Sequence, residues 1–358
     1  MGSATAWALA RRGVDTVLLE RFPAGHDHGS SHGASRVFRL AYPIELYAAL
    51  ARTALPGWRA LETEAGTSLL TRTGAIDLGD PKPIEDIAGV LRAIDAPFEF
   101  LSPRDASARW PGTRIESDVL YHPDGGVLAA DACVAAFQRC ARERGAELLF
   151  EHAVQRIRPR NDEVVVETER AEISAEVVVV TAGAWVAPLL EGIIRLPLLR
   201  ITQEQPAYFR PRDPATDWPV FIHRHPPGTG PTQLEGMGAY GLPSPGEGMK
   251  VGEHGTGPVV DPDRRPDPDP AGIERVSRYV ERWLPGLDPE PVSIISCLYT
   301  TTPDDHFAIG RIGRVVVGSP CSGHGFKFAP ALGDLLADLA GGKGEVPAPW
   351  ATVSLPQG

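Results

Sequence analysis

The stretch Gly2-Ser3-Ala4-Thr5-Ala6-Trp7-Ala8-Leu9-Ala10-Arg11-Arg12-Gly13-Val14-Asp15-Thr16-Val17-Leu18-Leu19-Glu20 decides the fold. Alanine and leucine recur at helical spacing over residues 3–12, Gly13 ends that helix, and residues 14–19 form an apolar strand. A helix followed by a strand is half of a βαβ unit, in which Gly2 would let helix and sheet pack closely and Glu20 would accept ribose hydroxyls. Many α/β proteins also end a strand in Glu, so the pattern alone leaves a purely structural reading open.

Length and composition indicate a two-domain protein that does not bind nucleic acid. At 358 residues the chain exceeds what one hydrophobic core fills. Its net charge of −11 argues against nucleic acid or an anionic membrane as partner, because both need a basic stripe. The four cysteines include no CxxC pair, which suits a reducing compartment, and no apolar run is long enough to cross a bilayer. We therefore expect a cytoplasmic protein. We also expect a monomer without a metal site.

Beyond Glu20, alternating helices and strands continue on both sides of an inserted segment with a different composition. Residues 201–292 are rich in Pro and Gly with short alternating strands, which predicts an antiparallel sheet. Elsewhere the pattern predicts helices over 45–64, 84–94, 130–144 and 327–339, strands over 75–78, 119–122, 147–150, 177–180 and 314–318, and a hairpin from 154 to 166.

Three segments have residue types suited to binding or chemistry. In residues 29–39 small side chains let backbone amides approach a ligand, and Arg36 and Arg39 offer planar forks that match carboxylate or pyrophosphate, although composition alone favours a solvated loop. Residues 322–327 open a helix with two glycines, where free amides and the helix dipole favour an anion, although a plain helix entry has the same form. Cys297 alone is by default a small buried hydrophobe.

In their order along the chain these segments resemble the monomeric sarcosine oxidase and N-methyltryptophan oxidase group of FAD-dependent amine oxidases. The resemblance covers nearly the whole chain. It rests on Arg36, Arg39 and Ala41-Tyr42, Thr73-Gly74, Asp124–Val127, Ala182–Trp185, Gly248–Gly252, Cys297–Thr300 and Gly323–Phe328. It implies a Rossmann-like, glutathione-reductase-like FAD domain over 1–72, 130–200 and 305–358, and a substrate domain with an antiparallel sheet over 73–129 and 201–304.

The resemblance also implies a role for each matching residue. Cys297 would bond covalently to FAD, Lys250 would promote the reaction with oxygen, and Arg39 and Lys327 would hold a substrate carboxylate. Tyr240 would join this substrate-binding set, although it lies one residue closer to Lys250 than the family spacing. The catalytic set implied is Lys250, Arg36, His254 and Tyr299. The cofactor-binding set is Gly2, Glu20, Ser31, His32, Arg36, Val154, Gly183, Trp185, Cys297, Gly323, His324, Gly325 and Lys327.

The implied activity is oxidation of a small secondary amino acid, N-methylated or cyclic, with molecular oxygen as acceptor. The products would be an imine, hydrolysed by water to an aldehyde and an amine, and hydrogen peroxide. A flavin dehydrogenase, or a D-amino-acid or glycine oxidase on the same scaffold, is the alternative, and the presence of Lys250 and Cys297 favours the oxygen-using oxidase.

The start of the sequence departs from this family pattern. The family begins with a strand and a Gly-x-Gly-x-x-Gly turn, whereas this sequence starts at the residue before the third glycine. Without that strand the sheet would lose the turn that approaches the pyrophosphate. We therefore expect the coding sequence to extend upstream. A non-catalytic remnant that binds a partner is the other alternative, which absence of flavin in an extended chain would favour.

Overall fold

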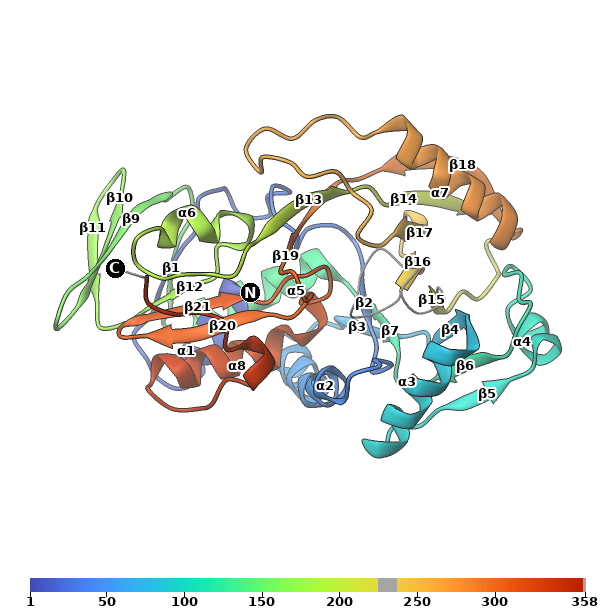
Figure 1. Cartoon of the computed structure of the whole chain (residues 1–358), viewed down its shortest axis with the longest axis horizontal. Coiled ribbons are helices and arrows are strands. Elements are labelled where there is room, and N and C mark those ends of the chain that lie inside the picture. The colour runs from blue at the N-terminus through green and yellow to red at the C-terminus, as the bar shows by residue number, and fades with distance from the viewer. Residues whose placement is uncertain (225–236, 357–358) are drawn as a thin grey trace.

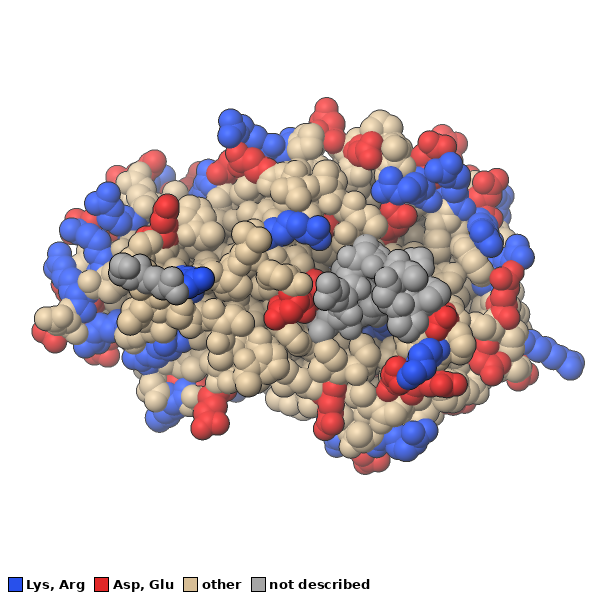
Figure 2. Space-filling view, in the orientation of Figure 1, with Lys and Arg blue, Asp and Glu red and all other residues tan. Residues whose placement is uncertain are grey.

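The computed structural model of the chain describes residues 1–224 and 237–356. Its elements gather in two lobes, with strands β9, β10 and β11 at one end of the molecule and α4, β5, α7 and β18 toward the other (Figure 1). Acidic and basic side chains are interspersed around the rim of the face in Figure 2. No helix in the described part of the chain combines the length and the apolar character that crossing a membrane would require.

The first lobe contains two separate parallel strand pairs. β1 (Val17–Leu19) pairs with β8 (Glu147–Leu149), and β12 (Val178–Val180) pairs with β21 (Val315–Ser319). β21 also pairs, in antiparallel sense, with β20 (Ala308–Ile312). Within the described residues no strand joins β1 to β12. A third sheet consists of β9 (Val154–Pro159), β10 (Val164–Thr168) and β11 (Glu172–Ala175).

Helices from both ends of the chain cover these sheets. α1 (Gly2–Arg11) packs against α5 (Ala130–Glu143) and α8 (Ala329–Ala340), and α2 (Glu45–Ala65) completes the layer. Gly333 permits the contact of α8 with α1, because a Cβ there would lie 2.7 Å from the Ala4 carbonyl oxygen. Trp7 and Trp58 are fully buried on either side of Phe137, with ring centroids 5.4 Å from it. Burial of these large rings stabilises the layer.

The second lobe is built on an eight-stranded sheet. Its order is β18 (Leu287–Ile294), β14 (Ala207–Pro211), β17 (Gly248–Glu253), β16 (Met237–Ser244), β15 (Val220–Arg224), β4 (Ala75–Gly79), β6 (Val119–His122) and β5 (Glu99–Leu101). All neighbours are antiparallel except β15 and β4, which are parallel. Helices α7 (Pro270–Trp283) and α4 (Pro103–Arg109) lie against this lobe.

Two small sheets lie between the lobes. β2 (Arg36–Phe38), β7 (Gly126–Leu128) and β3 (Leu70–Arg72) form one, and β13 (Arg200–Glu204) pairs with β19 (Cys297–Thr301) in the other. The remaining elements are α3 (Pro81–Ala93), α6 (Val186–Leu190) and the 3-10 turns η1 (Gly183–Trp185), η2 (Phe326–Phe328) and η3 (Ala348–Trp350). All eight strands of the large sheet fall within 73–129 and 201–304, but Ile84, Ile87 and Leu91 of α3 share a core with Trp58. Helix α3 therefore packs across the expected domain boundary.

The structure differs from the sequence-based elements at several places, of which three bear on the site or the second lobe. Strand β1 begins at Val17 rather than Val14, and α8 begins at Ala329 after a 3-10 turn that contains Lys327. Helix α7 was not expected in a segment read as strands and loops. Its signals were local: the Asp269 carboxylate accepts hydrogen bonds from Ala271 N and Gly272 N, and Pro270 occupies the first turn.

Candidate active site

A large cavity lies where the elements of both lobes meet. Its volume is about 1780 Å³, above the roughly 300–1,000 Å³ typical of small-molecule pockets. Every residue that the sequence assigned to a site lines it. They are Gly2, Glu20, Ser31, His32, Arg36, Arg39, Val154, Gly183, Trp185, Tyr240, Lys250, His254, Cys297, Tyr299, Gly323, His324, Gly325 and Lys327.

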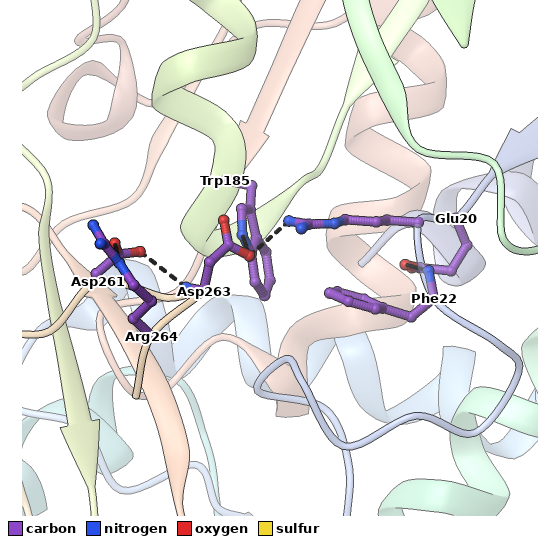
Figure 3. A network of polar contacts seen from close by, with 7 residues as sticks. Glu20, Phe22, Trp185, Asp261, Asp263 and Arg264 are labelled. Atoms are coloured by element: carbon purple, nitrogen blue, oxygen red, sulfur yellow. Dashed lines mark hydrogen bonds and ion pairs between the residues drawn. The ribbon is translucent and has the colours of Figure 1, made fainter. Parts of the chain in front are cut away.

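One end of the cavity is formed by the ends of β1 and β12. Glu20 follows β1, and its carboxylate accepts a hydrogen bond from Phe22 N at 3.0 Å (Figure 3). Gly2 faces Thr181, and a Cβ at Gly2 would lie 2.9 Å from Thr181 Oγ1. A larger residue at position 2 would therefore push into the wall after β12, so glycine keeps helix α1 close to this sheet.

Arg36 organises the loop of residues 29–36. Its guanidinium donates to the carbonyls of Ser35 and Ser30, both at 2.8 Å. Asp131 on α5 accepts from Gly33 N at 2.8 Å and fixes the same loop from outside. His32 is held inside this loop with its Nε2 buried and without a hydrogen-bond partner among the described residues. Burial, and then the charge of Arg36, lowers the pKa of His32 to about 4, so the ring is neutral at pH 7.

Lys250 is one of only four lysines in the chain and is almost completely buried. It lies on β17 directly opposite Tyr208 of β14, with its Nζ 5.8 Å from the Tyr208 ring centroid. Burial, reinforced by the charge of Arg36, lowers the pKa of Lys250 to about 7. This ammonium therefore changes charge near neutral pH.

Cys297 lies on β19 at the junction of the lobes, with a free and buried thiol. Burial raises the pKa of Cys297, while the nearby charges of Arg36 and Lys250 oppose that shift. Two residues further along the strand, the hydroxyl of Tyr299 lies 3.2 Å from His254 Nδ1. Tyr240 is hydrogen-bonded to Tyr299, so the one-residue difference in its spacing does not take it out of the cavity. Burial raises the pKa of both tyrosines and keeps them neutral.

Two buried cations converge on Tyr42. The Arg39 guanidinium lies 4.1 Å from the Tyr42 ring centroid, and Lys327 Nζ donates to the Tyr42 hydroxyl at 2.8 Å. Lys327 Nζ also donates to the carbonyl of His324 at 2.7 Å. Such a pair of cations inside a cavity favours an anion, and a carboxylate matches the fork of Arg39.

The glycine-rich loop before η2 is packed too tightly for side chains. A Cβ at Gly325 would lie 1.6 Å from the Pro320 carbonyl oxygen. Gly323 has a φ of +77°, and a Cβ there would lie 2.4 Å from Tyr299 Cε2. Both positions therefore require glycine, and the loop backbone itself forms part of the cavity wall.

Sequence reasoning missed three residues that shape this site. Tyr42 was quoted only as part of a matching segment, yet it joins Arg39 to Lys327. Asp131 holds the 29–36 loop from a helix 98 residues away, for which the sequence contains no local signal. Trp58 donates from Nε1 to the Lys327 carbonyl at 2.7 Å and fixes the turn that carries this lysine. Of these three residues only Tyr42 could have been identified from the sequence, because it is an aromatic residue three positions after Arg39.

These features fit a flavin dinucleotide. The cavity extends from Glu20, which follows β1, to Cys297 on β19, and both residues line it. At Gly2 and Gly325 the neighbouring atoms leave no room for a side chain, so the backbone itself forms the cavity wall there. The unpartnered Nε2 of His32 and the ammonium of Lys250 supply buried polar groups to a ligand in the same cavity. We find no residue among these that would exclude FAD.

Known proteins match the chain over nearly its whole length. The family model described as FAD dependent oxidoreductase matches residues 1–339. A peroxisomal sarcosine oxidase of Mus musculus is 35% identical over 356 residues, covering 95% of this chain and 89% of that protein. A monomeric sarcosine oxidase of Bacillus sp. (strain NS-129) is 30% identical over 359 residues, covering 95% and 90%. The solved open form of NikD, described as an unusual amino acid oxidase essential for nikkomycin biosynthesis, has a TM-score of 0.83 at 29% identity, covering 94% of this chain and 90% of that chain.

Proposed function

The chain belongs to the FAD-dependent oxidoreductase family and acts on amines with FAD as cofactor, and we propose that its substrate is a secondary amino acid whose nitrogen is methylated or part of a ring. The acceptor in this proposal is molecular oxygen, and the products are hydrogen peroxide and an imine that water hydrolyses. Similarity to the two sarcosine oxidases supports the amino acid class. The observation that carries the proposal is the convergence of Arg39 and Lys327 on Tyr42 in the cavity that also contains Cys297 and Lys250.

The substrate carboxylate would bind between Arg39 and Lys327. Both side chains are almost completely buried, so little water competes for their charge. Tyr42 and the His324 carbonyl fix the Lys327 ammonium in advance, which lowers the entropy lost on binding. The neutral hydroxyls of Tyr240 and Tyr299, with His254, would line the side of the pocket where the amine lies. An amine without a carboxylate would therefore be a poor substrate.

The redox chemistry, removal of a hydride equivalent from the carbon beside the amine nitrogen and transfer of electrons to oxygen, is what FAD supplies when bound. Arg36 and His32 would contact the cofactor from the 29–36 loop, and Cys297 would hold it covalently. Lys250 would place a positive charge where negative charge develops on oxygen. Over the chain, residues 1–72, 130–200 and 305–358 would form the cofactor domain, and 73–129 and 201–304 the substrate domain.

Replacing Lys250 with Met should slow the reaction of the reduced enzyme with oxygen by about 100- to 1,000-fold, the effect of removing one preorganised charge at a reacting centre. The reduction of the enzyme by substrate should change far less, because Arg39 and Lys327 remain. Stopped-flow absorbance separates the two half-reactions. Lys82→Met, which alters an exposed lysine, is the matched control. Equal oxygen rates in parent and Lys250→Met would remove Lys250 from this role.

The same lysine gives the oxygen reaction a pH dependence. Since the pKa of Lys250 is lowered to about 7, the ammonium is present below that pH and is lost as pH rises through it. The rate of reoxidation should therefore fall with rising pH around a midpoint near 7. Reoxidation rates measured from pH 5.5 to 10 check this, with Lys250→Met expected to give a flat profile. A fall that persists in Lys250→Met would assign the titration to another group.

Peroxide assays over a substrate panel test the function as a whole. Peroxide from N-methyl or cyclic amino acids, in stoichiometry with oxygen consumed, is the expected result. Turnover only with an artificial electron acceptor would indicate a dehydrogenase instead. Peroxide only from primary D-amino acids or glycine would reassign the substrate class while leaving the family unchanged.

A further inference from the structure

Asp263 connects two parts of the cavity wall, the residues that follow β1 and those that follow β12. Its carboxylate oxygen Oδ1 accepts from Arg21 Nη1 at 2.8 Å and from Trp185 Nε1 at 3.0 Å (Figure 3). Arg21 follows β1 and Trp185 follows β12, and both line the cavity. Since β1 and β12 belong to separate sheets in the described chain, this carboxylate joins the two sheet ends across the Glu20 end of the cavity.

The aromatic rings beside Asp263 close the same wall. Phe22 and Trp185 meet edge to face with centroids 5.5 Å apart. The Arg21 guanidinium lies 5.1 Å from the Phe22 ring and 5.7 Å from the Trp185 ring. Asp263 thus fixes both a cation and a ring of this small aromatic group, and the orientation of the wall depends on it.

The segment of residues 258–266, called here the strap, holds Asp263 in place by its own bonds. Asp261 accepts from Asp263 N at 3.0 Å and from Arg264 Nε at 2.9 Å, which shapes a tight turn (Figure 3). The strap is fastened to β13 by Gln203, whose backbone N donates to Pro258 O at 3.0 Å and whose side chain donates to Pro266 O at 2.9 Å. The carboxylate is therefore presented by an ordered segment.

The strap is also connected to the region of Cys297. Gln203 of β13 pairs with Leu298 of β19, and Glu204 pairs with Cys297. One pair of strands thus links the strap at the Glu20 end to the cysteine at the other end of the site. The strap, β13 and β19 would therefore form one connected set of elements beside a cofactor that spans the cavity.

We propose that Asp263 is a positioning residue for the adenosine half of FAD, and that its contacts to Arg21 and Trp185 slow the release of the cofactor. The proposal rests on the FAD assignment and on the placement of the ribose at Glu20. It does not depend on which amino acid is oxidised. The exposed ion pair has a modest energy, so the expected effect is on the rate of exchange rather than on the ability to bind.

The experiment measures cofactor release in the absence of a covalent bond. Full-length Cys297→Ser protein is loaded with FAD, and release is followed by flavin fluorescence on dilution. Adding Asp263→Ala should accelerate release about three- to tenfold, as expected for loss of an exposed ion pair and a hydrogen bond. Asp263→Asn should give an intermediate rate that no longer increases with salt, because a neutral acceptor for Trp185 remains.

FMN separates positioning from general destabilisation, because it lacks the adenosine half. Its release should be the same with and without Asp263→Ala. Glu116→Ala, which removes another exposed ion pair (2.6 Å to Arg114), should leave FAD release unchanged. Equal FAD release with and without Asp263, or equal acceleration for FMN, overturns the proposal, and a chain that takes up no FAD overturns it together with the cofactor assignment. Faster FAD release without any peroxide formation would support it and contradict only the proposed oxidase activity.

Discussion

Cys297→Ser should release all of its flavin on acid denaturation, whereas the parent polypeptide should remain yellow. Cys297 is the cysteine on β19; burial raises its pKa, and the nearby cations Arg36 and Lys250 oppose that shift. A thioether from this sulfur would survive denaturation, while every non-covalent contact is lost. The flavin absorbance of the washed acid precipitate would be a direct measurement of the attachment.

Cys321 offers a matched control for this experiment. It lines the same cavity and its sulfur accepts from Thr300 N at 3.3 Å, but it lies in the loop before η2 rather than on β19. Cys321→Ser should keep the flavin as the parent does. Flavin retained in Cys297→Ser and lost in Cys321→Ser would move the attachment to Cys321, and a colourless parent would remove covalent attachment altogether.

Lys327→Met should raise KM for the amino acid substrate by about 30- to 5,000-fold, corresponding to the roughly 2–5 kcal/mol lost when one partner of a buried charge pair is truncated. The remaining cation, Arg39, would still attract the carboxylate but from one side only. The value of kcat should change less, provided the amine still reaches the same place. Steady-state kinetics on the best substrate of the panel provide the measurement.

A substrate without the carboxylate distinguishes this role from a packing role. Lys327 also holds Tyr42 and the His324 carbonyl, so its loss could loosen the turn. If it acts on the carboxylate, the corresponding amine without that group should show similar KM in parent and Lys327→Met. Similar losses for both substrates would indicate damaged packing, and an unchanged KM for the amino acid would contradict the binding role. Lys82→Met serves again as the exposed control.

The residues of the site could be predicted from the sequence because several short segments occur in the same order as in the family that the chain resembles. Lys250 and Cys297 are far apart in sequence, and nothing in their local patterns predicts that they line one cavity. Only the resemblance to the family predicted that they share a site. Local signals were sufficient for helix α1, which begins after Met1 and ends at Arg11, because its alanines and the following glycine agree.

Other features depend on contacts between distant segments and were not readable. The parallel pairing of β4 with β15 joins residues 75–79 to 220–224 within an otherwise antiparallel sheet. Nothing in the sequence around Asp131 or Asp263 indicates a partner. Only the fold brings Asp131 to Gly33 and Asp263 to Trp185. Tyr42 received no role from the sequence, because the partner of its hydroxyl, Lys327, is 285 residues away.

The packing of α1 against α8 has a consequence for synthesis on the ribosome. Helix α1 is synthesised long before its partner surface around Gly333 on α8. At a translation rate of roughly 5–20 residues per second, the apolar face of α1 waits on the order of 15 to 65 seconds for that partner. Trp7 can pack against Phe137 once α5 is made, but the face of α1 around Ala4, which contacts Gly333, stays uncovered for all of this time, so the nascent chain is a natural client for a chaperone that covers apolar helices.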